Sequence, residues 1–129
     1  MVNRRRARPT NAELEILRVL WRRGASTVRE VHEELTAAKP TGYTTVLKLM
    51  QIMSEKGLVR RNVEQRAHVY EAREAEEVTQ RQLLGDLLDR AFDGSATKLV
   101  MQVLSSRRAS ATELDEIRAV LDELGGEEK

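Results

Sequence analysis

The sequence contains no cysteine, only two prolines and only two histidines. Without cysteine the chain can form no disulfide, no thiolate metal site and no cysteine nucleophile. No apolar run approaches the roughly 20 residues that a membrane-spanning helix needs, so we expect no membrane insertion. The basic start of the chain, residues 3–8, is not followed by the apolar segment of a secretory signal, so we expect a cytoplasmic protein.

Patterns typical of catalytic and metal sites are also missing. The chain has no glycine-rich phosphate loop and no Gly-x-Ser-x-Gly nucleophile motif. His32 lacks the second histidine that completes a zinc-protease helix. Neighbouring carboxylates such as Glu33 and Glu34 do not face each other on a helix. We therefore expect no enzyme, no metal site and no cofactor.

What the sequence does have is an uneven distribution of charge. Residues 1–72 hold 14 basic and 8 acidic side chains, a net charge of +6. Residues 73–129 hold 8 basic and 13 acidic side chains, a net charge of −5. The basic first part favours an anionic partner, whereas the acidic second part indicates a different task.

Three helices are predicted in the basic part. Thr10 with Glu13, and Thr27 with Glu30, form the pattern that caps a helix N-terminus, and Gly57 suits the end of the third helix. Apolar residues of the third helix recur at the spacing of one buried face. They are Val46, Leu49, Met50 and Met53.

The apolar period changes from 3.6 to 2 after this helix. Residues 58–63 and 67–71 alternate as strands do, and the polar residues 64–66 between them suit a turn, so a β-hairpin is predicted. Three helices followed by a hairpin are the elements of a winged helix-turn-helix. We expect this DNA-binding domain in residues 10–72, after a flexible basic arm in residues 1–9.

The third helix and the hairpin are the parts expected to contact DNA. In a helix-turn-helix the second of two packed helices enters the major groove, with its N-terminal residues at the base edges. The start of the third helix offers hydroxyl groups and a lysine, and the hairpin offers two arginines and a histidine, all suited to phosphates or base edges. The residues predicted to bind DNA are Tyr43, Thr44, Thr45, Lys48, Arg61, Arg66 and His68.

Residues 73–129 are predicted to form three further helices, separated at Asp93–Ser95 and before Ser110, and ending at Gly125. So short a segment cannot bury all of its large apolar side chains against itself. A second copy would cover the surplus, so we expect a helical homodimerisation domain behind the winged helix, in a mainly α fold. The residues expected in that interface are Leu84, Leu87, Leu88, Phe92, Leu99, Val100, Val103, Leu114, Ile117 and Leu121.

Six segments, in this order and spacing, carry a resemblance to a known family. They are TNAELEIL (residues 10–17), LW (20–21), TVREV (27–31), YTTV (43–46), KGLV (56–59) and RAHVY (66–70). Over about residues 10–124 the chain resembles the penicillinase-repressor (BlaI/MecI) family of bacterial transcriptional regulators.

The resemblance implies a cytoplasmic repressor that binds an inverted repeat overlapping a promoter as a homodimer. In family members that respond to β-lactams, a membrane sensor-protease leads to cleavage within the dimerisation lobe, and repression ends. By similarity this region is the helix that holds Met101, Gln102 and Val103, where the sequence departs from the Asn-Phe pair of the best-known members. The cysteine cluster of the copper-responsive branch is absent, so the resemblance implies no copper cofactor.

The residues themselves leave alternatives open. Thr44 and Thr45 could cap the third helix, and Lys48 could be an ordinary solvated lysine. The protein could be a winged-helix regulator gated by a small molecule, although its second lobe has few polar groups to orient a ligand. It could also be a winged-helix protein-interaction module, which the uneven charge disfavours.

Overall fold

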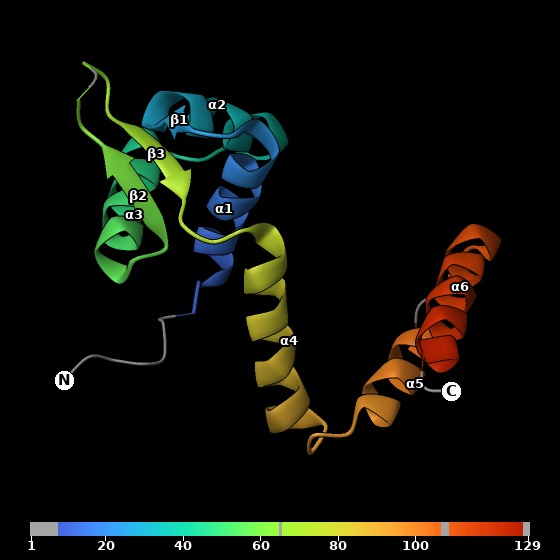
Figure 1. Ribbon diagram of the computed structural model, residues 1–129. Coiled ribbons are helices and arrows are strands. Elements are labelled where there is room, and N and C mark those ends of the chain that lie inside the picture. The colour runs from blue at the N-terminus through green and yellow to red at the C-terminus, as the bar shows by residue number, and fades with distance from the viewer. Residues whose placement is uncertain (1–7, 65, 107–108, 128–129) are drawn as a thin grey trace. The chain divides into compact units, whose positions relative to one another are not determined.

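The computed structural model describes residues 8–64, 66–106 and 109–127 (Figure 1). The helices and strands are α1 Asn11–Arg23, β1 Ser26–Thr27, α2 Val28–Ala38, α3 Tyr43–Lys56, β2 Val59–Asn62, β3 Val69–Ala72, α4 Glu76–Ala91, α5 Ala96–Ser106 and α6 Ala111–Glu127. By their contacts the residues fall into two compact units, one ending at Leu83 and the other beginning at Leu84. Most of the predicted basic arm, residues 1–7, lies outside the described residues.

The first two helices begin at the predicted capping boxes. At α1 the Glu13 N–H donates to Thr10 Oγ1 (3.2 Å), and the Thr10 N–H donates to Glu13 Oε1 (2.9 Å). Thr27 and Glu30 make the same reciprocal pair at α2, at 3.1 and 2.9 Å. Each box satisfies backbone N–H groups that the helix itself leaves without a partner, and so fixes where the helix starts.

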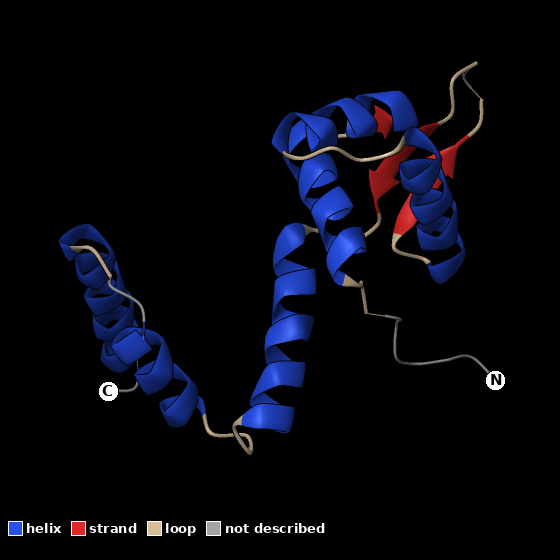
Figure 2. Cartoon of the chain, turned by 180° about the vertical axis from the view of Figure 1, so that it is seen from behind, coloured by secondary structure: helices blue, strands red, loops and turns tan. Residues whose placement is uncertain are grey.

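The predicted hairpin is confirmed, and it belongs to a sheet of three strands. All pairs are antiparallel, in the order β1-β3-β2. Figure 2 shows the strands in red. Tyr70 in the central strand pairs with Ser26 on one side and with Arg61 on the other. The added strand β1 places the start of α2 beside the hairpin.

The core of the first unit lies between α1, α2, α3 and the sheet. Val46, Met50 and Met53 of α3 are fully buried, as their spacing predicted. Leu49, predicted on the same face, is only partly buried and packs against the edge of this core. The opposite face of α3 is therefore left to solvent.

The second unit holds α5, α6 and the later part of α4. Asp93 and Gly94 have positive φ angles (52° and 76°), which end α4 where the sequence predicted a break. The predicted helix end at Gly125 is wrong, because α6 continues through Gly125 and Gly126 to Glu127. A glycine lowers helix stability by only about 1 kcal/mol and ends a helix mainly where it turns left-handed, which neither glycine does.

Candidate nucleic-acid interface

The N-terminal part of α3 is exposed on the side away from the core. Tyr43, Thr44, Thr45 and Lys48 all lie on this surface. The residue before the helix, Gly42, provides no side-chain cap. Thr44 and Thr45 are thus inside the helix and do not cap it, which excludes the capping alternative, and both residues are exposed.

The hairpin residues predicted to bind DNA are exposed as well. The pairing of β2 with β3 places the neighbouring residues Arg60 and Arg61 opposite different partners. Arg60 lies opposite Glu71, and the two side chains form an ion pair of 3.6 Å. Arg61 lies opposite Tyr70 instead. Because adjacent strand residues point to opposite faces, Arg60 is neutralised on one face while Arg61 is presented on the other.

A groove of about 430 Å³ lies between the start of α2, one side of α3 and the hairpin. It brings together four of the seven predicted residues: Tyr43, Arg61, Arg66 and His68. The other three, on the exposed start of α3, are not part of its lining. The predicted residues therefore form a groove and an adjoining helix surface, both in the first unit.

Arg29 and Gln51 also line the groove, and the sequence analysis did not include them among the residues predicted to bind DNA. Arg29 lies two residues after Thr27, which pairs with Val69 where the two-residue strand β1 meets β3. This two-residue strand carries no alternating pattern that could predict it. Gln51 was visible on the polar face of the third helix, but its spacing alone did not distinguish it from a solvated residue.

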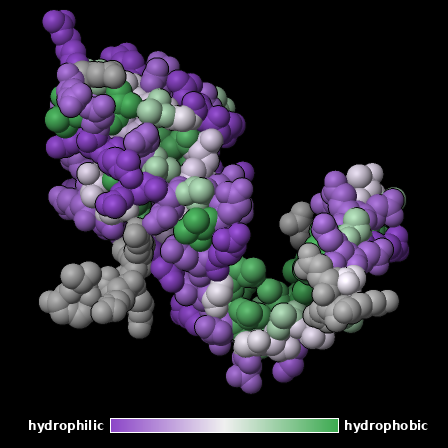
Figure 3. Space-filling view, in the orientation of Figure 1, coloured by the Kyte–Doolittle hydropathy of each residue, from purple (hydrophilic) through white to green (hydrophobic). Residues whose placement is uncertain are grey.

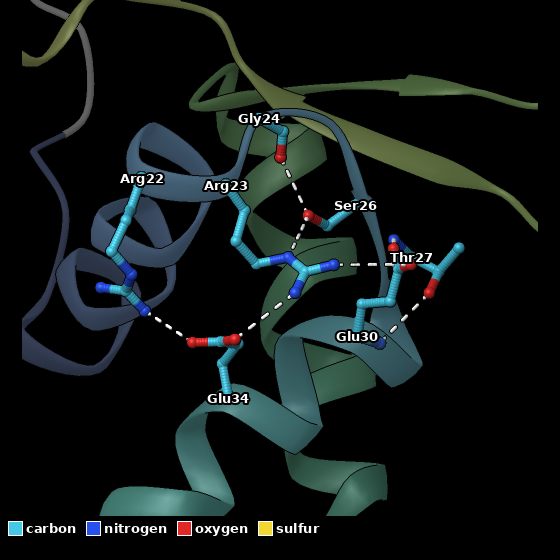
Figure 4. Close-up of polar contacts among 7 residues, drawn as sticks. All are labelled: Arg22, Arg23, Gly24, Ser26, Thr27, Glu30 and Glu34. Carbon is cyan, nitrogen blue, oxygen red and sulfur yellow. Dashed lines mark hydrogen bonds and ion pairs between the residues drawn. The ribbon is translucent and has the colours of Figure 1, made fainter.

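The arginines of the α1–α2 corner are occupied by ion pairs (Figure 4). Glu34 lies between Arg22 Nη2 (2.8 Å) and Arg23 Nη1 (3.4 Å), and Arg23 Nη2 also lies 3.5 Å from Glu30. The hydrogen bond donated by Arg22, helped by both positive charges, lowers the pKa of the Glu34 carboxyl. These two arginines therefore hold α1 against α2.

The basic residues of the candidate interface have no such partners in the part of the chain that the structure describes. Among the residues that the structure describes, Arg29, Lys48, Arg61 and Arg66 take part in no salt bridge. Three of them line the groove and Lys48 lies on the adjoining surface of α3. Their positive charge is thus available to an external anion.

A buried ion pair fixes the far end of α3. The Nζ of Lys56, in the last turn of α3, donates to Glu13 Oε1 at 2.7 Å. The Glu13 side chain is only 2% exposed, and its Oε1 also accepts the capping bond from Thr10. One carboxylate thus joins the start of α1 to the end of α3.

The comparisons with known proteins agree with this architecture. A family model described as "Penicillinase repressor" matches residues 9–123. The chain belongs to the penicillinase-repressor family. It is 34% identical to the transcriptional regulator BlaI of Mycobacterium tuberculosis (strain CDC 1551 / Oshkosh) over 113 residues, which cover 87% of this chain and 81% of that protein.

Other members of the penicillinase-repressor family are more distant. The penicillinase repressor of Bacillus licheniformis is 25% identical over 88% of this chain and 89% of its own length. The methicillin resistance regulatory protein MecI of Staphylococcus aureus (strain N315) is 20% identical over 88% and 92%. These relatives are described as regulators and repressors, a family without enzymatic activity, as the sequence predicted.

A solved structure supports the fold of the first unit. The solution structure of the DNA-binding domain of the repressor BlaI matches with a TM-score of 0.51 and 24% identity, over 57% of this chain and 90% of that chain. The predicted winged-helix fold is thereby confirmed.

Two other features are absent from the described residues, a metal-binding group and a membrane-spanning helix. In residues 8–64, 66–106 and 109–127, no group of three acidic or histidine side chains could hold a metal ion. Nor is any helix in the described part of the chain both long and apolar enough to cross a membrane.

Proposed function

We propose that this member of the penicillinase-repressor family is a DNA-binding transcriptional repressor that binds an inverted-repeat operator as a homodimer in the bacterial cytoplasm. The observation that carries the proposal is the groove beside α3, lined by Arg29, Arg61 and Arg66, which form no salt bridge with the described residues. Groups of this kind bind the phosphates of a DNA backbone and position the protein on the duplex.

The two parts of the interface have different tasks in this proposal. The start of α3 lies in the major groove, where Thr44, Thr45 and Lys48 meet base edges and nearby phosphates. The backbone of one strand passes through the groove between α3 and the hairpin. His68, at the hairpin end of the groove, adds a further hydrogen-bonding group.

The salt dependence of binding tests this division. The affinity falls as salt rises, and each phosphate contact that is lost makes the slope of log affinity against log salt shallower by about one. We expect Arg29→Gln and Arg66→Gln to make this slope shallower with every duplex, as measured by fluorescence anisotropy. Arg22→Gln is the matched control, since it removes the same charge from a residue paired with Glu34. Slopes equal to the parent's in both groove variants would contradict the proposal.

Exposed apolar side chains in the second unit support the homodimer. Of the predicted interface residues, six are exposed in the single chain: Leu84, Leu87, Val100, Val103, Ile117 and Leu121. The other four, Leu88, Phe92, Leu99 and Leu114, are partly buried. Hydrophobic surface gathers on the later part of α4 and on α5 (Figure 3). A monomer rarely leaves so much contiguous apolar surface to water.

The two complete helices of this unit also form a groove, which is lined mostly by apolar residues and also by Glu113 and Glu116. Val103 and Leu104 of α5 face Ile117, Val120 and Leu121 of α6 around a volume of about 460 Å³. In a two-fold dimer the same surface meets itself, so a side chain from the partner can fill this space. Leu121, which is 61% exposed, is the most exposed of the large apolar residues that line this groove.

Sedimentation equilibrium tests the homodimer. We expect the parent to have twice the monomer mass of 14.7 kDa, and Leu121→Glu to shift it towards the monomer, because a carboxylate is costly to bury without a partner. Val63→Glu is the control, since Val63 is an equally apolar, exposed residue of the hairpin, outside this unit. A parent of monomer mass at micromolar concentration would exclude the homodimer.

The proposed dimer provides a way to end repression. Two linked half-site contacts bind far more tightly than either one alone, so separation of the lobes releases DNA without changing α3. Met101 and Gln102 of α5 are exposed and do not line the groove that the partner would fill, so they are within reach of a protease, such as one activated by a membrane sensor. If a site-specific protease sequence is placed at Gln102–Val103, cutting it should weaken operator binding; undiminished binding would contradict this route.

A further inference from the structure

His32 lies where α2 approaches the turn that leads into α3. Its Nε2 is 2.7 Å from the carbonyl oxygen of Thr41. A carbonyl oxygen can only accept, so Nε2 carries the proton in this contact. The hydroxyl of Thr36, one turn further along α2, donates to the same oxygen (3.3 Å). The turn between the two helices is thus held from α2 at two points.

The same histidine ring contacts the first residue of α3. The ring centroids of His32 and Tyr43 are 5.6 Å apart and the ring planes are inclined by 77°. This is the edge-to-face arrangement that aromatic pairs prefer. Tyr43 is 45% exposed and lines the groove, whereas His32 is partly buried and does not line it. His32 therefore supports Tyr43 from the side of α2.

A large side chain at the surface loses rotational freedom when it binds a partner, and this loss weakens binding unless the side chain is already held in place. In the structure the hydrogen bond to Thr41 fixes the His32 ring, and the His32 ring limits where the Tyr43 ring can lie. The backbone that carries Tyr43 is fixed by the same turn.

We propose that His32 is a positioning residue for sequence recognition, which holds the Tyr43 ring in the orientation that meets one particular nucleotide of each half-site. This inference rests on the proposed DNA binding. His32 acts through Tyr43 and not through a phosphate, so its loss reduces the preference for the operator while the affinity for unrelated duplexes stays the same.

Two variants separate the ring from the hydrogen bond. His32→Gln keeps an N–H donor for Thr41 and removes the ring, whereas His32→Phe keeps a ring beside Tyr43 and removes the donor. We expect His32→Gln to lower the ratio of operator to unrelated-duplex affinity by about 2- to 12-fold, the range of an aromatic pair. His32→Phe should lose less selectivity than His32→Gln, because a ring remains beside Tyr43 although the hydrogen bond to Thr41 no longer fixes it.

A double variant identifies Tyr43 as the target. If His32 acts through Tyr43, adding His32→Gln to Tyr43→Ala should cause no further loss of selectivity. The salt slope should be unchanged in all these variants, since none of them removes a lysine or an arginine. Full selectivity in His32→Gln, or equal losses in the parent and Tyr43→Ala backgrounds, would overturn the inference.

A measurement without DNA keeps the two proposals distinguishable. The chain has only two tyrosines, so the ring signals of Tyr43 are readily assigned by NMR. The chemical shifts of the Tyr43 ring should differ from those of the parent in His32→Gln. Only a protein with a ring at residue 32 should restore them. Unmoved signals would overturn the positioning role even if operator binding is confirmed, whereas a parent that selects no operator would overturn the proposed function.

Discussion

The ion pair between Glu13 and Lys56 gives a sharp prediction for stability. In Lys56→Met the Glu13 carboxylate, 2% exposed, keeps only the hydrogen bond from the Thr10 N–H. Breaking a buried ion pair in this way costs about 3–5 kcal/mol. Lys56 is 27% exposed, so water can reach the carboxylate from that side. We therefore expect a loss near the lower end, about 3 kcal/mol.

A loss of this size is large for the first unit. At about 4–8 °C per kcal/mol for a domain of 60–100 residues, the melting temperature should fall by about 12–24 °C. Trp21 is the only tryptophan and its Nε1 donates to the Glu74 carbonyl within this unit (3.0 Å), so its fluorescence reports unfolding of this unit. Urea titration followed at Trp21 gives the free energy of unfolding.

A double variant tests the physical reason for the loss. In Glu13→Gln with Lys56→Met, the neutral amide needs no counter-charge, and its oxygen still accepts the capping bond from Thr10. The double variant should therefore recover most of the stability lost in Lys56→Met. A single variant that loses under about 1 kcal/mol, or a double variant as unstable as the single one, would refute the account of a buried unpaired charge.

Two further predictions concern acid stability and glycine. The pKa of Glu34 is lowered from 4.5, chiefly by the Arg22 hydrogen bond. The contribution of Glu34 to stability is therefore present above pH 4.5 and is lost as the pH falls through the lowered value. In urea titrations from pH 6 to 3, Glu34→Gln should lose less unfolding free energy than the parent. Gly57→Ala should destabilise the first unit by about 1–2 kcal/mol, because the φ of Gly57, 82°, is left-handed. Gly125 lies within α6, so Gly125→Ala should stabilise that helix by up to about 1 kcal/mol. Thermal unfolding measures both effects. A loss of stability in acid as large in Glu34→Gln as in the parent would contradict the first prediction. Stability changes of the same sign in Gly57→Ala and Gly125→Ala would contradict the second.

The features that the sequence predicted correctly depend on local physics. A capping box spans four residues, so Thr10 and Thr27 could be recognised without knowing the fold. The buried face of α3 follows from helical spacing, which needs only that the helix packs on one side. The exposed start of α3 follows in turn, so the predicted interface residues on this helix lie on its surface in the structure.

The features that were missed depend on contacts between distant segments. Arg29 lies in the groove because β1 pairs with β3, a contact between residues more than 40 positions apart. The pairing of Lys56 with Glu13 likewise joins residues 43 positions apart. Gly57 and Gly125 are chemically the same, yet only Gly57 ends a helix, since the segment after it turns into the sheet. No local pattern distinguishes these cases.

The central claim is that a two-fold dimer reads DNA through α3 and the adjoining groove. The most direct measurement is selection of bound duplexes from a random pool by the full chain, followed by sequencing. The account predicts an enriched inverted repeat whose half-sites are spaced by about one helical turn, 10–10.5 base pairs, or a multiple of it. Enrichment of a single unrepeated site, or of no sequence at all, would contradict it.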